Sequence, residues 1–309
     1  MRLIALINQK GGVGKTTSAV NLGAALAEAG RRVLLVDLDP QANLSLHLDH
    51  ALDADEPSTY SVLIGNSPVS AAIRPTTTEG LRLVASNIDL SGAELELASA
   101  FGRESLLKDA LAKWEAEERA ANGEAPVDYV LLDCPPSLGL LSINGLVAAH
   151  EVIVTMQTEF FALQGISKLM DVFELIRQRL NPELAISGIL PCLYDSRLKL
   201  AREVLAEIRK YFPGQVLPRP ISKNVKLAEA PSYGKTIFEY APGSPGAQDY
   251  RALALEVIAQ EESPAEPASE APADDLAEIT LRPRPAPEPE ASPGATPEAT
   301  KASGADAGE

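Results

Sequence analysis

A glycine-rich loop joins the first apolar run of the sequence to an amphipathic helical pattern, and this feature restricts the possible folds most strongly. The apolar run is Leu3–Ile7, and the loop after it reads Asn8-Gln9-Lys10-Gly11-Gly12-Val13-Gly14-Lys15-Thr16-Thr17. Glycines permit positive φ angles and a helix N-terminus carries partial positive charge, so such a loop can direct several backbone N–H groups at phosphate oxygens. The order strand, glycine loop, helix predicts a phosphate-binding unit.

Five further short runs, rich in β-branched residues and leucine, alternate with helical patterns as far as residue 260. These runs are Val33–Asp37, Leu81–Ala85, Tyr129–Asp133, Val152–Met156 and Ile186–Leu190. Alternation of this kind predicts an α/β fold, in which a doubly wound, mostly parallel sheet is flanked by helices on both faces.

Two local patterns predict how particular helices begin and pack. One helix is expected to bury a stripe of apolar residues spaced mostly by three and four, formed by Ile166, Leu169, Met170, Phe173, Ile176 and Leu180. Another is expected to begin with a capping box, in which Ser91 and Glu94 each satisfy a backbone N–H group.

The composition changes at Glu261. Residues 261–309 hold nine prolines, twelve acidic and three basic side chains, so this segment carries −9 of the formal net charge of −16. Such a segment cannot bury enough apolar surface to offset chain entropy, and we therefore predict a folded domain over residues 1–260 and a disordered tail over residues 261–309. Leu276–Leu281 is a short apolar island that is either a spacer or a motif for docking a partner.

The sequence lacks the marks of a secreted, membrane-spanning or cluster-binding protein. Its two cysteines, Cys134 and Cys192, belong to no C-x-x-C or Cys/His group, which argues against an iron–sulfur site and a disulfide framework. No apolar run reaches the roughly 18 residues of a transmembrane helix, and the N-terminus lacks a signal-peptide pattern. We expect a cytoplasmic protein that does not bind membranes.

Acidic residues stand at the ends of two predicted strands. Asp37 and Asp39 close the second run, and Asp133 closes the fourth. The carboxyl ends of parallel strands face the ligand crevice of the sheet, so these side chains are expected near the phosphate loop. Mg²⁺ prefers oxygen ligands, which the Thr16 hydroxyl and the Asp133 carboxylate would supply. Two acids one residue apart point in opposite directions, so Asp37 and Asp39 should have different roles.

The string K-G-G-V-G-K-T-T resembles the ParA/MinD family of deviant Walker ATPases, although Gln9 stands where the plain phosphate-loop pattern has glycine. The resemblance implies that the second lysine, Lys10, contacts the nucleotide held by a partner subunit, which makes ATP part of a homodimer contact. The alternative is that Lys10 assists the phosphate site of its own chain. The segments D-x-D-P-Q, from Asp37, and D-C-P-P-S, from Asp133, resemble further signatures of the family.

The resemblance covers residues 1–260 and implies an ATPase with the following site. Its catalytic residues are Lys10, Lys15 and Asp39, of which Asp39 positions or deprotonates the attacking water. Its ATP-binding residues are Lys10, Gly11, Gly12, Val13, Gly14, Lys15, Thr16, Thr17, Ser222 and Asn224, and its Mg²⁺ residues are Thr16, Asp37 and Asp133. Ser222 and Lys223 replace a Pro-Arg pair of the family near the adenine.

A basic cluster interrupts the otherwise acidic chain. Nine basic and three acidic residues lie between Arg197 and Lys235, a net charge of +6. Phosphate neutralisation by such a cluster suffices for non-specific DNA binding, but a solvated helix surface, with Leu200, Val204, Ile208 and Phe212 buried beneath, has the same composition. The segment N-V-K-L-A-E-A-P-S-Y-G-K resembles ParA/Soj chromosome-partitioning proteins. Together with the match of Tyr194–Arg197, this resemblance implies DNA contacts by Arg197 and Lys226, and we expect Arg202 and Lys223 of the same basic cluster to contact DNA as well.

By this resemblance, the chain is expected to dimerise with ATP, bind double-stranded DNA non-specifically, associate with the nucleoid, and partition a chromosome or plasmid with a ParB-type partner that stimulates hydrolysis. A MinD-like membrane switch is one alternative, but it needs a basic amphipathic C-terminal helix where this chain has an acidic, proline-rich end. A metabolic enzyme with the same phosphate loop is another, which predicts a small-molecule pocket and a phosphorylated product.

Overall fold

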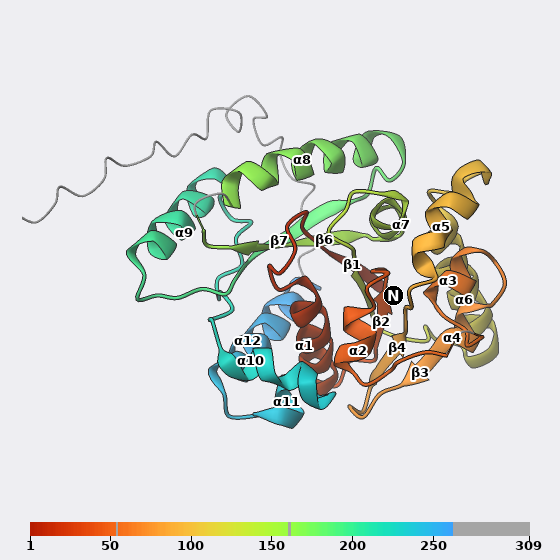
Figure 1. Ribbon diagram of the computed structural model, residues 1–309, viewed down its shortest axis with the longest axis horizontal. Helices are drawn as coiled ribbons and strands as arrows, with labels where there is room; N and C mark the ends of the chain where they lie inside the picture. The colour runs from red at the N-terminus through yellow and green to blue at the C-terminus, as the bar shows by residue number, and fades with distance from the viewer. Residues whose placement is uncertain (54, 160–161, 262–309) are drawn as a thin grey trace, which may run out of the picture. The chain divides into compact units, whose positions relative to one another are not determined.

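The protein is represented by a computed structural model that describes residues 1–53, 55–159 and 162–261. Seven strands form one sheet in the order β3-β4-β2-β5-β1-β6-β7 (Figure 1). Every neighbouring pair is parallel except β3–β4. The strands are β1 (Arg2–Ile7), β2 (Val33–Asp37), β3 (Ile73–Pro75), β4 (Leu81–Val84), β5 (Tyr129–Asp133), β6 (Glu151–Gln157) and β7 (Ala185–Cys192).

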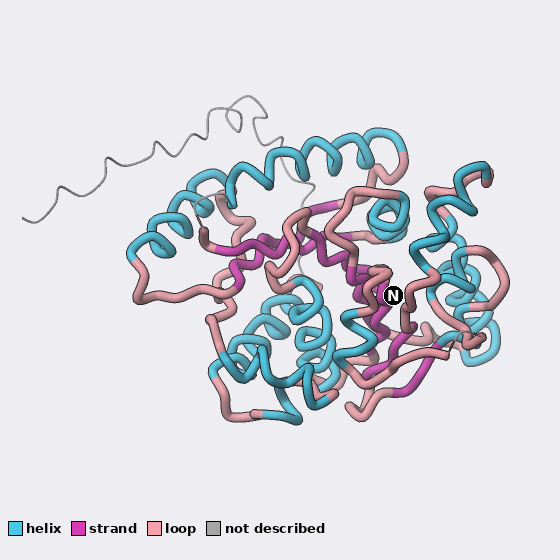
Figure 2. The backbone as a smooth tube through the Cα atoms, in the orientation of Figure 1, coloured by secondary structure: helices cyan, strands magenta, loops and turns pink. Residues whose placement is uncertain are grey.

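Helices cover both faces of the sheet, with α1, α11 and α12 on one side and α7 and α8 on the other (Figures 1 and 2). The described helices are α1 (Lys15–Glu28), α2 (Asn43–His47), α3 (Thr59–Leu63), α4 (Val69–Ala72), α5 (Leu90–Glu96), α6 (Leu106–Asn122), α7 (Leu140–Ala148), α8 (Ala162–Arg179), α9 (Lys199–Tyr211), α10 (Val225–Glu229), α11 (Ile237–Tyr240) and α12 (Pro245–Ala259), with short 3₁₀ turns η1 (Leu97–Ser99) and η2 (Ala230–Tyr233).

Alternate residues of the central strands supply the core on each face of the sheet. Ile4 and Leu35 belong to the cluster that packs α1 and α12 against one face. Gly23 of α1 permits this close packing, because a Cβ atom there would lie 2.8 Å from Leu35 Cδ2. The fully buried strands β1, β2 and β5 therefore hold their carboxyl ends in fixed positions, where the phosphate loop and the acidic residues lie.

The six strand runs predicted from the sequence are confirmed, as is the doubly wound arrangement. The sequence missed β3, which is a three-residue antiparallel edge strand ending at Pro75. The predicted tail over residues 261–309 falls outside the described residues from residue 262 onward, and so does Leu276–Leu281.

Three local predictions were wrong. The capping box fails because α5 already begins at Leu90, so Ser91 lies inside the helix and its hydroxyl donates to the Ile88 carbonyl, 2.7 Å away. Leu180 follows the end of α8 and is 42% exposed, so it does not continue the buried stripe. Leu200, in the first turn of α9, is 49% exposed, whereas Val204, Ile208 and Phe212 are buried.

Candidate functional site

The loop that follows β1 is held in shape by the neighbouring strand β6. Asn8 donates from Nδ2 to the Thr155 carbonyl and accepts the Lys10 backbone N–H at 2.9 Å. On the other side of the loop, Gln157 Nε2 donates to the Gly12 carbonyl at 3.2 Å. Gly12 and Gly14 have φ angles of 72° and 92°, which are conformations that favour glycine. The loop is therefore shaped by two positive-φ glycines and two polar anchors.

Helix α1 begins directly after this loop, and no side chain caps its N-terminus. The first backbone N–H groups of the helix therefore remain available for an anion, as phosphate sites of this type require. Lys15 lies in this first turn, almost fully buried, with Nζ 3.4 Å from the Lys10 carbonyl oxygen. Burial lowers the pKa of Lys15, while the negative charges of Asp133 and Asp39 act in the opposite direction. The structure thus brings Lys15 and both carboxylates together.

Asp37 and Asp133 are register partners on the adjacent strands β2 and β5. Asp37 is fully buried, and its carboxylate accepts three hydrogen bonds from its own chain: from the backbone N–H of Asp39 at 3.1 Å and from the N–H and hydroxyl of Ser45 at 3.0 and 2.7 Å. Burial raises the pKa of Asp37 to about 6. With both oxygens engaged, Asp37 is suited to position α2 and to support a metal site through charge.

The carboxylate of Asp133 differs from that of Asp37 in its hydrogen bonding. It is 1% exposed, and neither carboxylate oxygen has a hydrogen-bond partner of good geometry among the described residues, although the Thr16 hydroxyl lies close enough to favour its charged form. Burial, followed by the charge of Asp37, raises the pKa of Asp133 well above its ordinary value. Two buried oxygens without partners beside a threonine hydroxyl are what a hard divalent cation needs, so Thr16 and Asp133 fit a Mg²⁺ ion.

Asp39 lies at the start of the loop between β2 and α2, and its Oδ1 accepts the Gln41 backbone N–H at 2.9 Å. Its side chain is mostly covered. As expected for acids one residue apart, Asp37 is engaged inside the fold whereas Asp39 faces the phosphate loop closely enough to act on Lys15.

Lys10 extends from the loop into solvent rather than toward the buried Lys15. Its Nζ contacts Gln157 Oε1 at 2.8 Å and Glu159 Oε2 at 2.7 Å, and the Lys10 and Glu159 side chains are 54% and 60% exposed. No chemical reason for Glu159 is visible in the sequence alone. Its position two residues after the end of β6, beside the loop that follows β1, is the signal that could have found it, because β1 and β6 are neighbours.

Ser222 and Asn224 lie apart from the loop, along an open pocket of about 910 Å³ that also includes Tyr194 and Asp249. Ser222 pairs with Tyr194 beyond the end of β7, and its N–H donates to Asp249 at 2.9 Å. Asn224 caps α10 by accepting the Lys226 N–H. Gly14 of the phosphate loop lies beside the end of β7, because a Cβ atom at Gly14 would lie 3.4 Å from Cys192 Cβ, and Tyr194 of the pocket follows Cys192 by two residues.

The basic cluster is partly neutralised by acids that the sequence count left out. Arg197 donates to both carboxylate oxygens of Asp195, at 2.9 and 2.7 Å, and Arg219 Nε donates to Asp249 Oδ1 at 2.7 Å. Counting these two acids lowers the local charge from +6 to +4. The Arg197 guanidinium holds the pKa of Asp195 at about 2, so this pair stays charged at neutral pH.

The other predicted DNA contacts are exposed but not all are unpaired. Lys226 lies 2.9 Å from Glu229 and over the ring of Tyr240. Arg202 donates to the Ser196 carbonyl. Lys223 lines the open pocket together with Arg197, so the structure brings these two close to each other.

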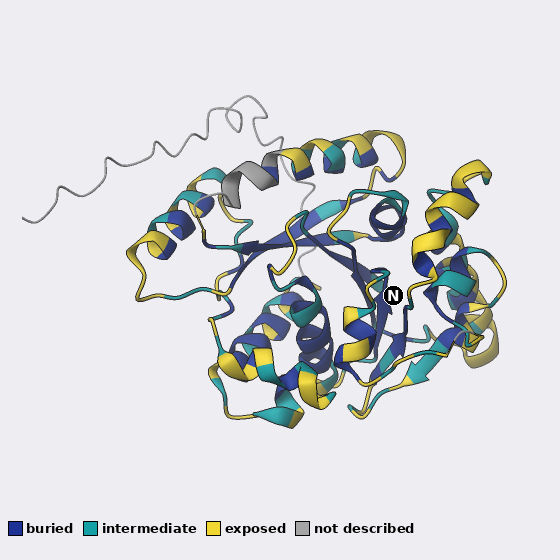
Figure 3. Ribbon diagram, viewed as in Figure 1, coloured by how far each residue is buried: buried dark blue, intermediate teal, exposed yellow. Residues whose placement is uncertain are grey.

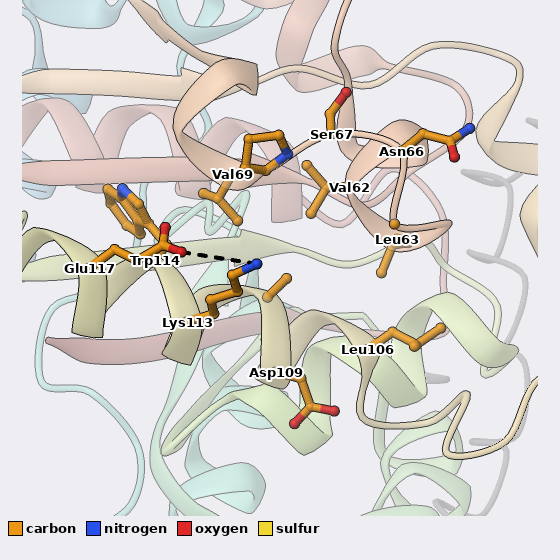
Figure 4. A pocket seen from close by; sticks show the side chains of 13 residues that line it. Val62, Leu63, Asn66, Ser67, Val69, Leu106, Asp109, Lys113, Trp114 and Glu117 are labelled. Carbon is orange, nitrogen blue, oxygen red and sulfur yellow. Dashed lines mark ion pairs between the residues drawn. The ribbon is translucent and has the colours of Figure 1, made fainter.

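A second pocket, of about 490 Å³, lies between α3 and α6 and is lined by Trp114, Lys113 and Glu117 among others (Figure 4). None of the predicted site residues lines it. Its Lys113–Glu117 pair spans 3.9 Å along the exposed side of α6.

Comparisons with known proteins show to which family this chain belongs. The family described as "AAA domain" matches residues 1–186. The sporulation initiation inhibitor protein Soj of Bacillus subtilis is 45% identical over 258 residues, which is 84% of this chain and 98% of Soj. The chromosome partitioning protein ParA of Myxococcus xanthus is 44% identical over 83% of this chain and 88% of its own length. The chain belongs to the ParA/Soj family of partitioning ATPases.

Solved structures agree with the ParA/Soj fold. A structure named cobyrinic acid a,c-diamide synthase, from Mycobacterium smegmatis with bound ADP and magnesium, is 40% identical, covers 88% of this chain and all of that one, and has a TM-score of 0.73. Within residues 1–53, 55–159 and 162–261 of this ParA/Soj chain, no helix is long and apolar enough to cross a membrane.

Proposed function

We propose that this chain binds ATP and Mg²⁺ at the phosphate loop and works as an ATP-switched homodimer that partitions DNA. The observation that carries the proposal is the separation of the two loop lysines. Lys15 is buried beside Asp133, whereas Lys10 is exposed at the surface of the site. A lysine in this position can reach a phosphate held by a second copy, so that nucleotide becomes part of the dimer contact.

The residues of the phosphate loop and the nearby acids have separate roles in the proposed ATP hydrolysis. The loop from Gly11 to Gly14 and the first turn of α1 cradle the phosphates, with Lys15 on the β and γ groups. Thr16 and Asp133 hold Mg²⁺, which neutralises charge that develops on the phosphate oxygens. Asp37 fixes α2 through Ser45. Asp39 orients the attacking water, and Lys10 of the second copy adds a positive charge near the γ-phosphate.

The DNA and partner roles rest on the ParA/Soj relatives and on the charge distribution. The dimer binds double-stranded DNA without sequence preference through Arg197, Arg202, Lys223 and Lys226, and this binding retains it on the nucleoid. Two copies double the local charge of +4, which strengthens phosphate neutralisation only in the dimer. A ParB-type protein stimulates hydrolysis and releases the dimer. In this proposal Ser222 and Asn224, which line the open pocket, contact the adenine.

Light scattering during gel filtration tests the switch directly. The Asp39→Ala protein, in which hydrolysis is blocked, should be dimeric with Mg-ATP and monomeric with Mg-ADP. Adding Lys10→Ala should abolish the dimer while nucleotide binding by each copy remains. Lys113→Ala is the matched control, because Lys113 is also exposed and also paired with a glutamate. A protein that stays monomeric with saturating Mg-ATP and blocked hydrolysis would disprove the proposal.

The name of the Mycobacterium smegmatis structure raises one alternative, an ATP-dependent synthase. That activity predicts ATP consumption that depends on cobyrinic acid and a nitrogen donor. The partitioning role predicts hydrolysis that responds to DNA and to the ParB-type protein instead. Parallel measurements of phosphate release under the two sets of conditions distinguish them.

A further inference from the structure

A stacked pair of tyrosines lies at the C-terminal end of the basic cluster. The rings of Tyr233, in η2, and Tyr240, in α11, have their centres 4.9 Å apart and their planes at 28°. Tyr233 is 61% exposed, so a large part of its ring is open to solvent. The stack therefore ends in an exposed aromatic face, to which the proposed function gives no role.

The inner ring of the pair, Tyr240, is fixed by two contacts with α10. Its hydroxyl donates to Glu229 at 2.8 Å, and Lys226 Nζ lies 5.5 Å from the centre of its ring. Lys226 also pairs with Glu229 at 2.9 Å, which balances the charge of this acid beside the rings. Tyr240 is thus a firm backing for Tyr233.

The backbone that follows Tyr233 is held as well. Gly234 has a φ angle of 64°, and a Cβ atom there would lie 2.8 Å from Asp49 Cβ, so only glycine allows this close approach. The next carbonyl, that of Lys235, accepts a hydrogen bond from His47 Nε2 at 3.1 Å. Tyr233 is therefore presented on a rigid turn, and little further ordering is needed when a ligand contacts its ring.

Lysines lie along the sequence on both sides of this turn. Lys223, Lys226 and Lys235 are exposed, and Figure 3 colours much of α10 as exposed. Of the two acids between residues 222 and 240, Glu229 pairs with Lys226 and Glu239 caps α11. Exposed lysines bind nucleic-acid phosphates without regard to base sequence. The segment thus combines phosphate-binding charge with an exposed aromatic ring.

This combination suits unpaired bases better than paired ones. In a duplex each base is already stacked on its neighbours, so a protein ring can stack on it only after the bases have been forced apart. An unpaired base offers an open face, and aromatic side chains within a basic surface are the platforms on which single strands stack. A base on Tyr233 would extend the stack that Tyr240 begins.

We propose that this surface also binds single-stranded DNA, with an unpaired base stacked on Tyr233. Tyr240 backs the ring, and Lys223 and Lys235 bind neighbouring phosphates. The inference goes beyond duplex binding and rests on the proposed function in one respect, because Lys223 serves both ligands. A single strand and a duplex therefore compete for the same surface.

Fluorescence anisotropy with labelled oligonucleotides, in Mg²⁺ and a non-hydrolysable ATP analogue, tests this proposal. The probes are an oligothymidylate, an oligouridylate RNA and a DNA duplex, each about 20 nucleotides or base pairs long, which exceeds a typical single-strand site. Tyr233→Ser should lower the affinity for oligothymidylate by about tenfold or more and change the affinity for the duplex by less than about twofold. Tyr233→Phe, which keeps the ring, should bind every probe as the parent does.

Two control variants separate stacking from charge and from apolar contact. Lys223→Ala should weaken the binding of both DNA probes by similar factors, because it removes a phosphate contact that carries no information about the bases. Val225→Ser is the matched control, since Val225 is 70% exposed at the start of α10 but has no ring. It should bind oligothymidylate as the parent does.

The outcomes distinguish this proposal from the partitioning role. If the parent binds the duplex but not oligothymidylate, or if Tyr233→Ser binds oligothymidylate as tightly as the parent, stacking on Tyr233 is refuted while the partitioning role stands. An equal loss with both DNA probes would also refute it, as would a loss confined to oligouridylate. If the parent binds oligothymidylate through Tyr233 but does not bind the duplex, the proposal stands and the duplex-binding role fails.

Discussion

Replacing Asp133 with asparagine should remove a buried negative charge without removing a hydrogen bond, because neither oxygen of Asp133 has a partner of good geometry among the described residues. Burial and the charge of Asp37 raise the pKa of Asp133 well above 3.8. Above pH 3.8 the unfolded chain releases this proton, while the folded chain retains it. The parent protein therefore loses stability as the pH rises through this interval, and the loss is complete above the folded pKa.

The size of the gain follows from the linkage between pKa and stability. Each pH unit by which a folded pKa exceeds the unfolded one corresponds to about 1.4 kcal/mol. The pKa of Asp133 is raised, so Asp133→Asn should gain stability over the parent as the pH rises above 4. The new amide also lacks partners, which costs about 1 kcal/mol at every pH. In a domain of this size each kcal/mol of net gain raises the Tm by about 2–4 °C.

Thermal unfolding followed by circular dichroism, from pH 4 to pH 8 with EDTA and without nucleotide, measures this difference. Asp55→Asn, at an exposed site, is the control and should follow the parent curve. Adding Mg-ADP at pH 7.5 should raise the Tm of the parent more than that of Asp133→Asn, because a bound cation compensates the buried charge only in the parent. If the parent and Asp133→Asn curves run parallel from pH 4 to pH 8, Asp133 does not carry a raised pKa and the reasoning fails.

Two further outcomes follow from the same geometry. Asp39→Ala should lower ATP turnover by about a hundredfold or more, which is the effect expected from removing a group that orients the attacking water. It should also leave a persistent ATP dimer on DNA. Turnover at the parent rate, measured as phosphate release, would rule out the role of Asp39. Asp195→Asn should free Arg197 from its ion pair and so increase DNA affinity at low salt. The slope of log affinity against log salt concentration should become steeper by about 0.9 for each copy. An unchanged slope, measured by fluorescence anisotropy, would show that Arg197 does not contact phosphate.

Local sequence patterns predicted most of the fold because the central strands are buried on both faces. Buried strands such as β2 and β5 are continuous apolar runs, and each ends at an acid that marks the ligand edge. The edge strand β3 lacks this signal, since three residues ending at Pro75 have neither length nor periodicity. The capping box was misread because Ser91 lies inside the first turn of α5, and the spacing of Ser91 and Glu94 alone does not show where the helix begins.

The sequence indicated the residues of the phosphate loop and the strand-end acids beside it, but not the long-range contacts that hold them. The loop residues are contiguous in the sequence, so their order alone indicates a phosphate-binding site. The contacts of Asp37 with Ser45, of Lys10 with Glu159 and of Arg219 with Asp249 join residues 8, 149 and 30 positions apart. Such pairings depend on which strands are neighbours, and counting charges along one segment therefore overestimated the basic cluster.

The Lys10–Glu159 pair explains how an exposed lysine can be held in place and still be available to a second copy. Both side chains are more than half exposed, so the pair contributes at most about 1 kcal/mol to the monomer. In the proposed dimer, a triphosphate in the site of the facing copy would offer several oxygens in a region shielded from water, where charge-assisted hydrogen bonds are stronger. The lysine therefore loses little when it leaves Glu159 and gains more when it reaches the nucleotide. On this account the free-energy difference between monomer and dimer depends on the nucleotide, and Glu159 only sets the position from which Lys10 starts.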